Sequence, residues 1–344
     1  MKIFRITALA IVTCVLMVSS VLADVLKIAT LAPEGSEWML EHRAAATKIK
    51  ERTEGRVVLK FYGGGVMGND KKVLRKIRIG QLQGAAFSAS GLMERYPDIV
   101  LYGMPFVFHS QAEVDYVRER LDATLIAGLR DAGFAVFGFA GGGFAVFMSA
   151  EPIRDHEDLK GMKIWVPEGD VISFTALESM NLSPVVLSMS DVLMGLQTGL
   201  LDAIVTPPSA ALLLQWYTKV NYINPMPVSY TLGMLAFDMR AFERLKASDQ
   251  AVVQEILVET YARLDAINRR DNIEAEDALL ANGLQLVESN PKDIPYWHGI
   301  ARETNESIWS KNSVDSGLLT RLMALLEEYR ATGADSAAVA DVGM

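Results

Sequence analysis

The chain has 344 residues, of which 50% are hydrophobic and 22% charged. This is ordinary globular usage and excludes a disordered or fibrous protein. Lys and Arg number 33 against 42 Asp and Glu, which gives a formal net charge of −9. An acidic protein repels phosphate backbones unless a strong basic patch compensates, and none is found, so we expect no nucleic-acid partner.

The N-terminus has the pattern of a secretory signal peptide. Basic residues precede an apolar run at 6–18, and the small residues that follow predict cleavage before Asp24, so residues 1–23 are assigned to the signal. The run is shorter than the ~20 residues of a spanning helix, which disfavours an uncleaved anchor. The only cysteine, Cys14, lies inside this segment, which leaves the mature chain without thiol chemistry. We expect an exported protein of the periplasm.

Short apolar runs alternate with helical patterns through most of the chain, which is typical of an α/β protein with largely parallel strands. Strands are predicted at residues 25–30, 57–62, 84–88, 134–139, 144–149, 162–166, 183–186 and 202–205. Helices are predicted at residues 37–52 behind the cap Ser36, at 69–78 and 111–131, and from Asp170 and Ser190. The glycine runs at 63–65 and 141–143 are interpreted as turns.

The pattern changes after Tyr230. A strand at 231–238 is followed by a helix that starts at the cap Ser248 and meets no Gly or Pro until Gly283. Such a helix is ~50 Å long at ~1.5 Å per residue, which exceeds the width of one small domain, so we expect it to cross two lobes. A last strand is predicted at 284–287 and two helices at 293–311 and 315–330.

No catalytic or metal-binding pattern stands out. The four histidines (His42, His109, His156 and His298) are scattered, without metal-ligand spacing, and no nucleophile elbow or phosphate loop is present. The basic stretch at 71–78 lies on one predicted helix and is interpreted as a solvated face. We therefore expect no enzyme activity, no metal and no cofactor; an exported hydrolase is the alternative without motif support.

Several collinear motifs resemble the solute-binding subunit of tripartite ATP-independent periplasmic (TRAP) transporters, the DctP family. The segment DLKGMKI at 158–164 with VP at 166–167 resembles the family signature D-L-K-G-x-K-I-R-V-P, and LQTGLLD at 196–202 resembles its A-L-Q-T-G-x-x-D segment. MGND at 67–70 corresponds to the L-G-D-D turn and PF at 105–106 to the P-F motif. The resemblance implies capture of a solute between two lobes and delivery to a membrane permease.

The order of the predicted elements and the family resemblance both predict a two-lobed, periplasmic-binding-protein-like α/β fold with a long helix that spans both lobes. The first lobe is predicted to comprise residues 24–147 and 231–272. The second lobe is predicted to comprise residues 148–230 and 273–332, with a flexible tail at 333–344.

The departures from the family pattern bear on the ligand. The family Arg that forks onto a ligand carboxylate aligns with Trp165, which offers a flat apolar face and one N–H donor instead. A second Arg of sialic-acid-binding members aligns with Ala145, an Asn with Leu31 and a Glu with Ala89. Polar anchors are thus replaced by apolar or neutral residues, and we expect a cleft for an apolar or weakly polar ligand.

The residues expected to form this cleft combine a stacking wall, an apolar lining and a few polar groups. Trp165 is the wall; the lining is Leu31, Phe87, Phe144 and Met189; Thr206 and Tyr217 supply hydrogen bonds; Trp38 and Asp170 lie at the rim. The alternative is a conventional organic acid, with new polarity from Glu34, Glu168, Asp170 or a backbone N–H cluster.

The partners follow from the resemblance. They are a small-molecule ligand, the membrane permease subunits and, by likeness to members that lack the Arg, a periplasmic tetratricopeptide-repeat protein. A role as the ligand-sensing partner of a membrane receptor is the further alternative, because such proteins share this fold.

Overall fold

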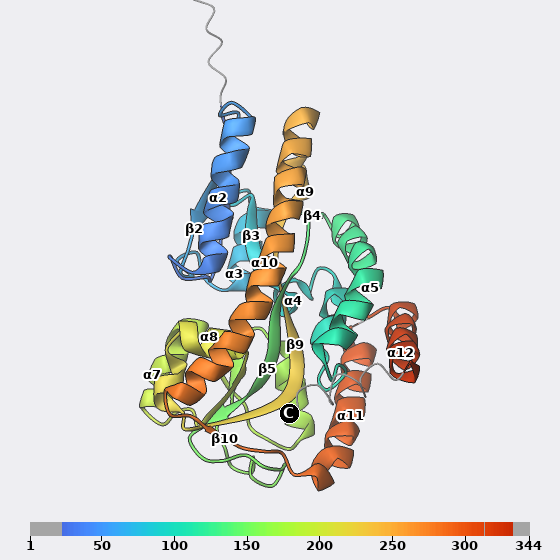
Figure 1. Ribbon diagram of the computed structural model, residues 1–344. Helices are drawn as coiled ribbons and strands as arrows, with labels where there is room; N and C mark the ends of the chain where they lie inside the picture. Colours follow the sequence, from blue (N-terminus) through green and yellow to red (C-terminus); the bar gives the residue numbers. More distant parts are fainter. Residues whose placement is uncertain (1–22, 313, 333–344) are drawn as a thin grey trace, which may run out of the picture.

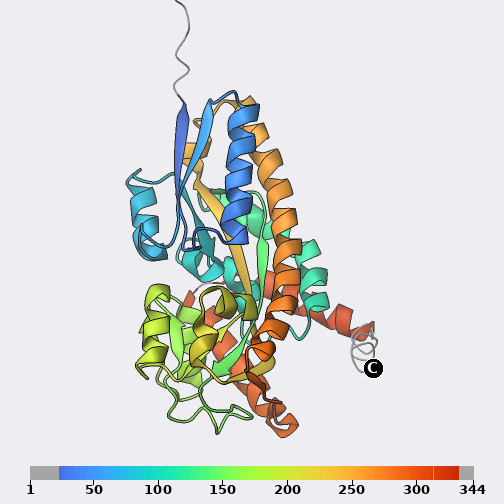
Figure 2. The same ribbon diagram turned by 60° about the vertical axis from the view of Figure 1, so that its left-hand side comes forward.

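The computed structural model describes residues 23–312 and 314–332, so the predicted signal peptide and tail lie almost wholly outside the described residues. Within these ranges no helix is both long and apolar enough to span a bilayer. The chain forms two lobes stacked end to end, with one long helix, α10 (Ala247–Ala281), running along both (Figures 1 and 2).

The first lobe is built on parallel strands whose alternating apolar residues point into the core. Strand β1 pairs in parallel with β2 on one side and β3 on the other, and β3 pairs antiparallel with β9. The elements are β1 (Asp24–Ala29), α2 (Glu37–Arg52), β2 (Val57–Tyr62), α3 (Asp70–Arg78), β3 (Gly84–Ser88), α4 (Ala89–Leu92), the 3₁₀ turn η1 (Pro97–Gly103), α5 (Gln111–Asp131) and β4 (Phe134–Val136).

Helices cover both faces of this sheet. One core lies between the sheet, α2 and the first half of α10, and contains Ile28, Met39 and Leu257. The other core lies under α3, α4, η1 and α5 and contains Leu92 and Leu121. Three layers result, with the apolar stripe of each helix facing the strands.

The second lobe, at the other end of α10, is likewise a sheet flanked by helices. The isolated bridge Ile164–Ala203 joins the two-stranded parallel sheet β6–β7 to β8. Its elements are β5 (Ala140–Ser149), β6 (Trp165–Pro167), α6 (Val171–Ser179), β7 (Val185–Leu187), η2 (Met189–Asp191), α7 (Val192–Gln197), β8 (Ala203–Thr206), α8 (Pro208–Leu213) and η3 (Trp216–Lys219). The rest of the chain forms β9 (Tyr222–Asp238), α9 (Met239–Phe242), β10 (Gln285–Leu286), η4 (Pro291–Asp293), α11 (Ile294–Asn312) and α12 (Ser316–Ala331). Of these, α9 and α12 pack in the cores of the first lobe.

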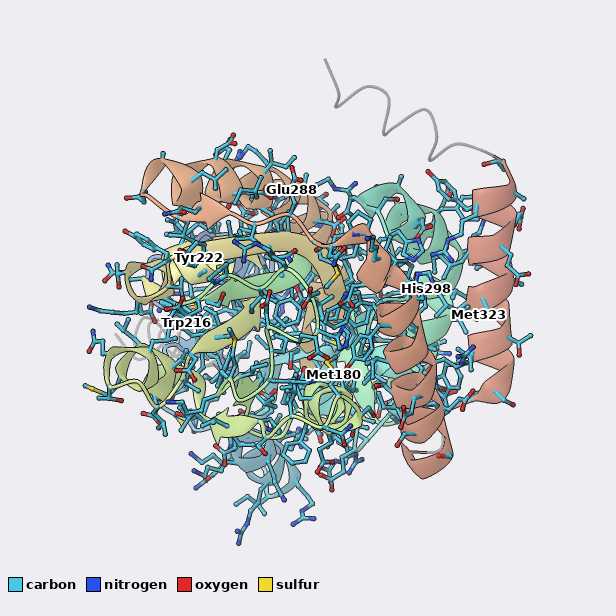
Figure 3. All side chains as sticks on the ribbon, turned by 90° about the horizontal axis from the view of Figure 1, so that it is seen from below. Met180, Trp216, Tyr222, Glu288, His298 and Met323 are labelled. Atoms are coloured by element: carbon cyan, nitrogen blue, oxygen red, sulfur yellow. The ribbon has the colours of Figure 1, made fainter. Side chains whose placement is uncertain are left out.

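Seen from below, α11 with His298 lies between the body of the second lobe and α12 with Met323 (Figure 3). Met180, at the end of α6, lies beside α11, and both helices belong to one core with Trp297 and Ile300. The opposite face of the second lobe is covered by α7, α8 and the end of α10, with Trp216 at its centre.

Two strands and one helix connect the lobes. Strand β5 runs antiparallel to β9 from Ala140 to Ser149, so both strands belong to both lobes. The interpretation of 141–143 as a turn between two strands is wrong: these glycines lie inside β5. Because Gly143 has φ +89°, they form a bulge that bends the strand without ending it.

Two other predictions are corrected. Strand β9 starts at Tyr222 rather than near residue 231. It can include Pro225 and Pro227 because these prolines lie in a stretch that makes no ladder pairs with β5. Helix α10 is not capped by Ser248; its N-cap residue is Lys246, which makes no side-chain cap bond. The two-lobed α/β fold with a spanning helix is confirmed, whereas the exact lobe boundaries stay a prediction.

His42 gives the first lobe a pH-dependent stability. It is fully buried, stacks on Trp38 at 3.6 Å and donates from Nδ1 to the Trp38 carbonyl at 2.8 Å. Burial lowers the pKa of His42 to about 4. Between pH ~6.5 and pH ~4, His42 is therefore protonated in the unfolded chain but neutral in the folded chain. The free energy of unfolding falls as the pH is lowered through this window.

We expect this loss to reach about 3 kcal/mol by pH 4. In His42→Gln the same window should be flatter, as measured by urea unfolding followed by tryptophan fluorescence at several pH values. His298→Gln, which removes an exposed histidine, is the matched control. An unchanged pH slope in His42→Gln would contradict the assignment.

Candidate functional site

The site lies where the carboxyl ends of the parallel strands of the two lobes end in loops. In open α/β sheets, ligands bind beyond these strand ends. In the first lobe these are the ends of β1, β2 and β3; in the second they are the ends of β6, β7 and β8. Ile172, in the first turn of α6, packs in one core with Phe87 of β3, so the two walls meet there.

The wall of the first lobe has a polar group that the site prediction missed. The Asp70 carboxylate accepts a hydrogen bond from Ser88 Oγ at 3.3 Å, and Ser90 Oγ lies 3.1 Å from Ser88 Oγ. A Cβ atom at Gly91 would lie 2.1 Å from Asp70 Oδ2, so glycine is what lets the carboxylate come this close. Burial raises the pKa of Asp70 to about 6. In the sequence, the only feature that points to Asp70 is the MGND turn at 67–70, which ends at this residue.

The apolar residues predicted for this wall are partly core residues. Phe87 is buried in β3, and Leu31 is half-buried in the loop after β1. Trp38 is half-buried; it stacks on His42 and packs with the core between the sheet, α2 and α10. Leu31 is the one of the three that lies in a strand-end loop.

In the second lobe, Trp165 links the first residue of β6 to the last residue of β7. Its side chain is only 4% exposed; its Nε1–H donates to the Leu187 carbonyl at 3.1 Å, and its ring meets Trp216 edge-to-face at 5.0 Å. The bond holds the last residue of β7, directly before the loop that carries Met189, which is 36% exposed. Trp165 is therefore a buried residue that holds the backbone of the second-lobe wall in place and exposes little of its own surface there.

The other residues predicted in the second lobe have different surroundings. Thr206 is buried at the end of β8, and Tyr217 is half-buried in the same core as Trp165. Asp170 is the N-cap of α6 and accepts hydrogen bonds from Ile172 N at 3.1 Å and from Ser173 Oγ at 2.8 Å. Burial raises the pKa of the Asp170 carboxyl.

The back of the site is the strand pair that joins the lobes. Phe144 of β5 packs edge-to-face on Tyr230 of β9 at 5.3 Å. Behind it, Asn272 of α10 donates to the Gly142 carbonyl at 2.9 Å and accepts from Ser209 Oγ at 2.8 Å. One side chain therefore links the long helix, the β5 bulge and the start of α8.

The loops at the six strand ends are acidic and lack basic residues. Residues 30–36, 63–70, 88–93, 168–173, 188–191 and 207–209 contain Glu34, Asp70, Glu168, Asp170 and Asp191 but no Lys, Arg or His. The described residues contain no group of three or more side chains suited to hold a metal ion.

Comparisons with known proteins agree with this geometry. The model of the bacterial extracellular solute-binding proteins, family 7 (DctP), matches residues 28–312. A solute-binding protein of Sulfitobacter sp. NAS-14.1 is 24% identical over 253 residues, which cover 71% of this chain and 75% of the relative. The sialic acid-binding periplasmic protein SiaP of Vibrio cholerae is 23% identical over 263 residues, covering 74% and 80%.

Solved structures show the same fold. A TRAP periplasmic solute-binding protein of Ralstonia eutropha with bound (S)-2-acetolactate has a TM-score of 0.82 at 19% identity, covering 89% of this chain and all of that one. A Bordetella pertussis extracytoplasmic solute receptor binding pyroglutamic acid has a TM-score of 0.80 at 19% identity, with the same coverages. The architecture is that of an extracytoplasmic solute receptor, a class of binding proteins rather than enzymes.

The chain belongs to family 7 of the bacterial extracellular solute-binding proteins, the DctP family of TRAP transporters. Proteins of this family work outside the cytoplasm, bind small molecules and serve membrane permeases.

Asp70 makes a testable contribution to stability. Because its folded pKa of about 6 exceeds the ordinary value near 3.8, the folded chain binds more protons between these two pH values. The free energy of unfolding therefore falls as the pH rises through this window. We expect Asp70→Asn to be more stable than the wild type by about 1 kcal/mol at pH 7.5 and equal to it at pH 4, since the group is partly accessible.

Chemical denaturation at both pH values measures this difference. Asp191→Asn, at another strand end, is the matched control. A loss of stability at pH 7.5 in Asp70→Asn would show that the carboxylate stabilises the fold and is not strained by burial.

Proposed function

We propose that the protein is the receptor of a TRAP transporter for a small uncharged solute, apolar or weakly polar, which it captures between its lobes and hands to a permease. The observation that carries this proposal is that the six strand-end loops contain five carboxylates and no basic residue. Two cations that reach these loops from neighbouring helices are already bonded, Arg43 to Glu34 and Lys76 to the Met67 carbonyl. A carboxylate ligand would lose its hydration there without an opposite charge, at a cost of several kcal/mol.

The contacts of Trp165 support the same ligand class. By resemblance, this residue stands where the family has its carboxylate-binding Arg. Its one donor is already bonded to Leu187, so it has no N–H left for a ligand anion. Met189 and Leu31 add accessible apolar surface, while Ser88, Ser90 and Asp70 provide hydrogen-bonding groups for a hydroxyl or amide.

An organic acid is the second candidate, favoured by the ligands named for solved relatives. Structures at 17–20% identity carry D-glucuronate, pyroglutamic acid and orotic acid. If this chain binds such an acid, backbone N–H groups or hydroxyls must hold the carboxylate. A tetratricopeptide-repeat partner remains a proposal that rests on the resemblance alone.

The solute can be identified by mass spectrometry of the purified mature protein, first under native conditions and then after organic extraction. We expect a co-purified neutral molecule, such as a lipid fragment or another weakly polar compound. A small hydrophilic acid in the native complex would contradict the proposal and restore the organic-acid candidate.

The role of Trp165 can be tested once that molecule is known. Trp165→Phe keeps most of the ring volume but removes the hydrogen bond to Leu187, which loosens the loop that carries Met189. We expect the dissociation constant to rise about fivefold, corresponding to one ordinary hydrogen bond. Trp216→Phe alters the same ring pair without touching a strand end and should change affinity less than twofold. Equal affinities in both variants would remove Trp165 from the site.

A further inference from the structure

Helix α3 presents a row of cations that have no acidic partner among the residues that the structure describes. Lys71, Lys72, Arg75 and Arg78 are exposed, and the ion pairs of the described residues include none of them. The fifth basic residue, Lys76, is used locally, because its Nζ donates to the Met67 carbonyl at 2.9 Å. The row is unusual in a chain with a net charge of −9.

Part of this arrangement costs the isolated helix stability, although Arg75 and Arg78 lie in the last turn, where the helix dipole favours cations. Lys71 and Lys72 lie in the first turn, where the positive end of the helix dipole disfavours cations. Lys71 and Arg75 are four residues apart, as are Lys72 and Lys76, and like charges at this spacing repel by a few tenths of a kcal/mol. An acidic surface placed against Lys71 and Lys72 would offset these costs.

Exposed apolar side chains stand at both ends of the helix. Val66, in the loop before α3, is 72% exposed, and Ile79, directly after it, is 64% exposed. Beside Ile79 lies a hollow of about 260 Å³, whose rim adds Arg244 and the ion pair of Arg240 with Asp238. Apolar anchors within a charged surround are the composition of a protein-binding surface. Figure 2 shows α3 at the left edge of the upper lobe, with no other helix outside it.

We propose that α3, with Val66 and Ile79, docks onto an acidic extracytoplasmic surface of the membrane permease that this receptor serves. A protein partner fits better than a lipid bilayer, because a flat anionic membrane would meet the acidic remainder of the molecule as well as this short helix. The row lies next to Asp70, so docking occurs beside the first-lobe wall of the ligand site. The inference rests on the proposed transport function but not on the identity of the ligand.

The test compares two double variants with the same change in net charge. Lys71→Glu/Arg75→Glu reverses the α3 row, and Lys48→Glu/Lys50→Glu reverses exposed cations on α2. Binding of each full-length mature protein to nanodiscs containing the membrane subunits of its transporter is measured at low and high salt. Empty nanodiscs with anionic phosphatidylglycerol are the lipid arm, and affinity for the co-purified solute is measured separately.

We expect the α3 variant to bind the loaded nanodiscs at least about tenfold more weakly, mainly through slower association, and the α2 variant to bind like the wild type. Wild-type binding should weaken with salt. Equal binding by both variants, equal losses in both, or no binding of the wild type to loaded nanodiscs would overturn the proposal. Binding to empty anionic nanodiscs that the α3 variant loses would assign the row to lipid instead. Unchanged solute affinity in the α3 variant separates a docking defect from a failure of the proposed transport function.

Discussion

The junction between β5, β9 and α10 is the constraint on which the two-lobed arrangement depends. Three side chains of α10 hydrogen-bond the backbone of Gly141 and Gly142. Asp265 accepts from Gly141 N at 2.8 Å, Asn268 donates to the Gly141 carbonyl at 2.9 Å, and Asn272 donates to the Gly142 carbonyl at 2.9 Å. Arg118 of α5 donates to Asp265 and to the Phe139 carbonyl, which holds the same segment from the first lobe. Buried backbone groups at a bulge are thereby satisfied by side chains.

This junction also positions the site. Because Asn272 accepts from Ser209 at the end of the β8 loop, the second-lobe wall is attached to the helix and the bulge that join it to the first lobe. A ligand that bridges the walls stabilises the closed arrangement by binding it better than the open one. In such a receptor the groups on the walls determine which ligand can drive closure, and here they are carboxylates, hydroxyls and apolar side chains.

Much of the first lobe could be predicted from local patterns. Helix α3 and strands β2 and β3 lie where the sequence indicated, because Asn69 caps the helix and alternating residues mark the strands. The glycines at 141–143 and the prolines of β9 indicate breaks where the structure has continuous strands, since pairing with a neighbouring strand overrides their local preference. The contact of Asp70 with Ser88 and that of Trp165 with Leu187 join different elements, so no local pattern reveals them.

The central claim is that the cleft accepts an uncharged ligand and rejects a carboxylate. It is tested most directly by measuring the thermal stability of the mature, ligand-stripped protein against matched pairs of small acids and their amides or methyl esters. We predict that no acid in the panel raises the melting temperature, while neutral members that fit the cleft do. An acid that raises it by several degrees, with no effect of its ester, would contradict the account.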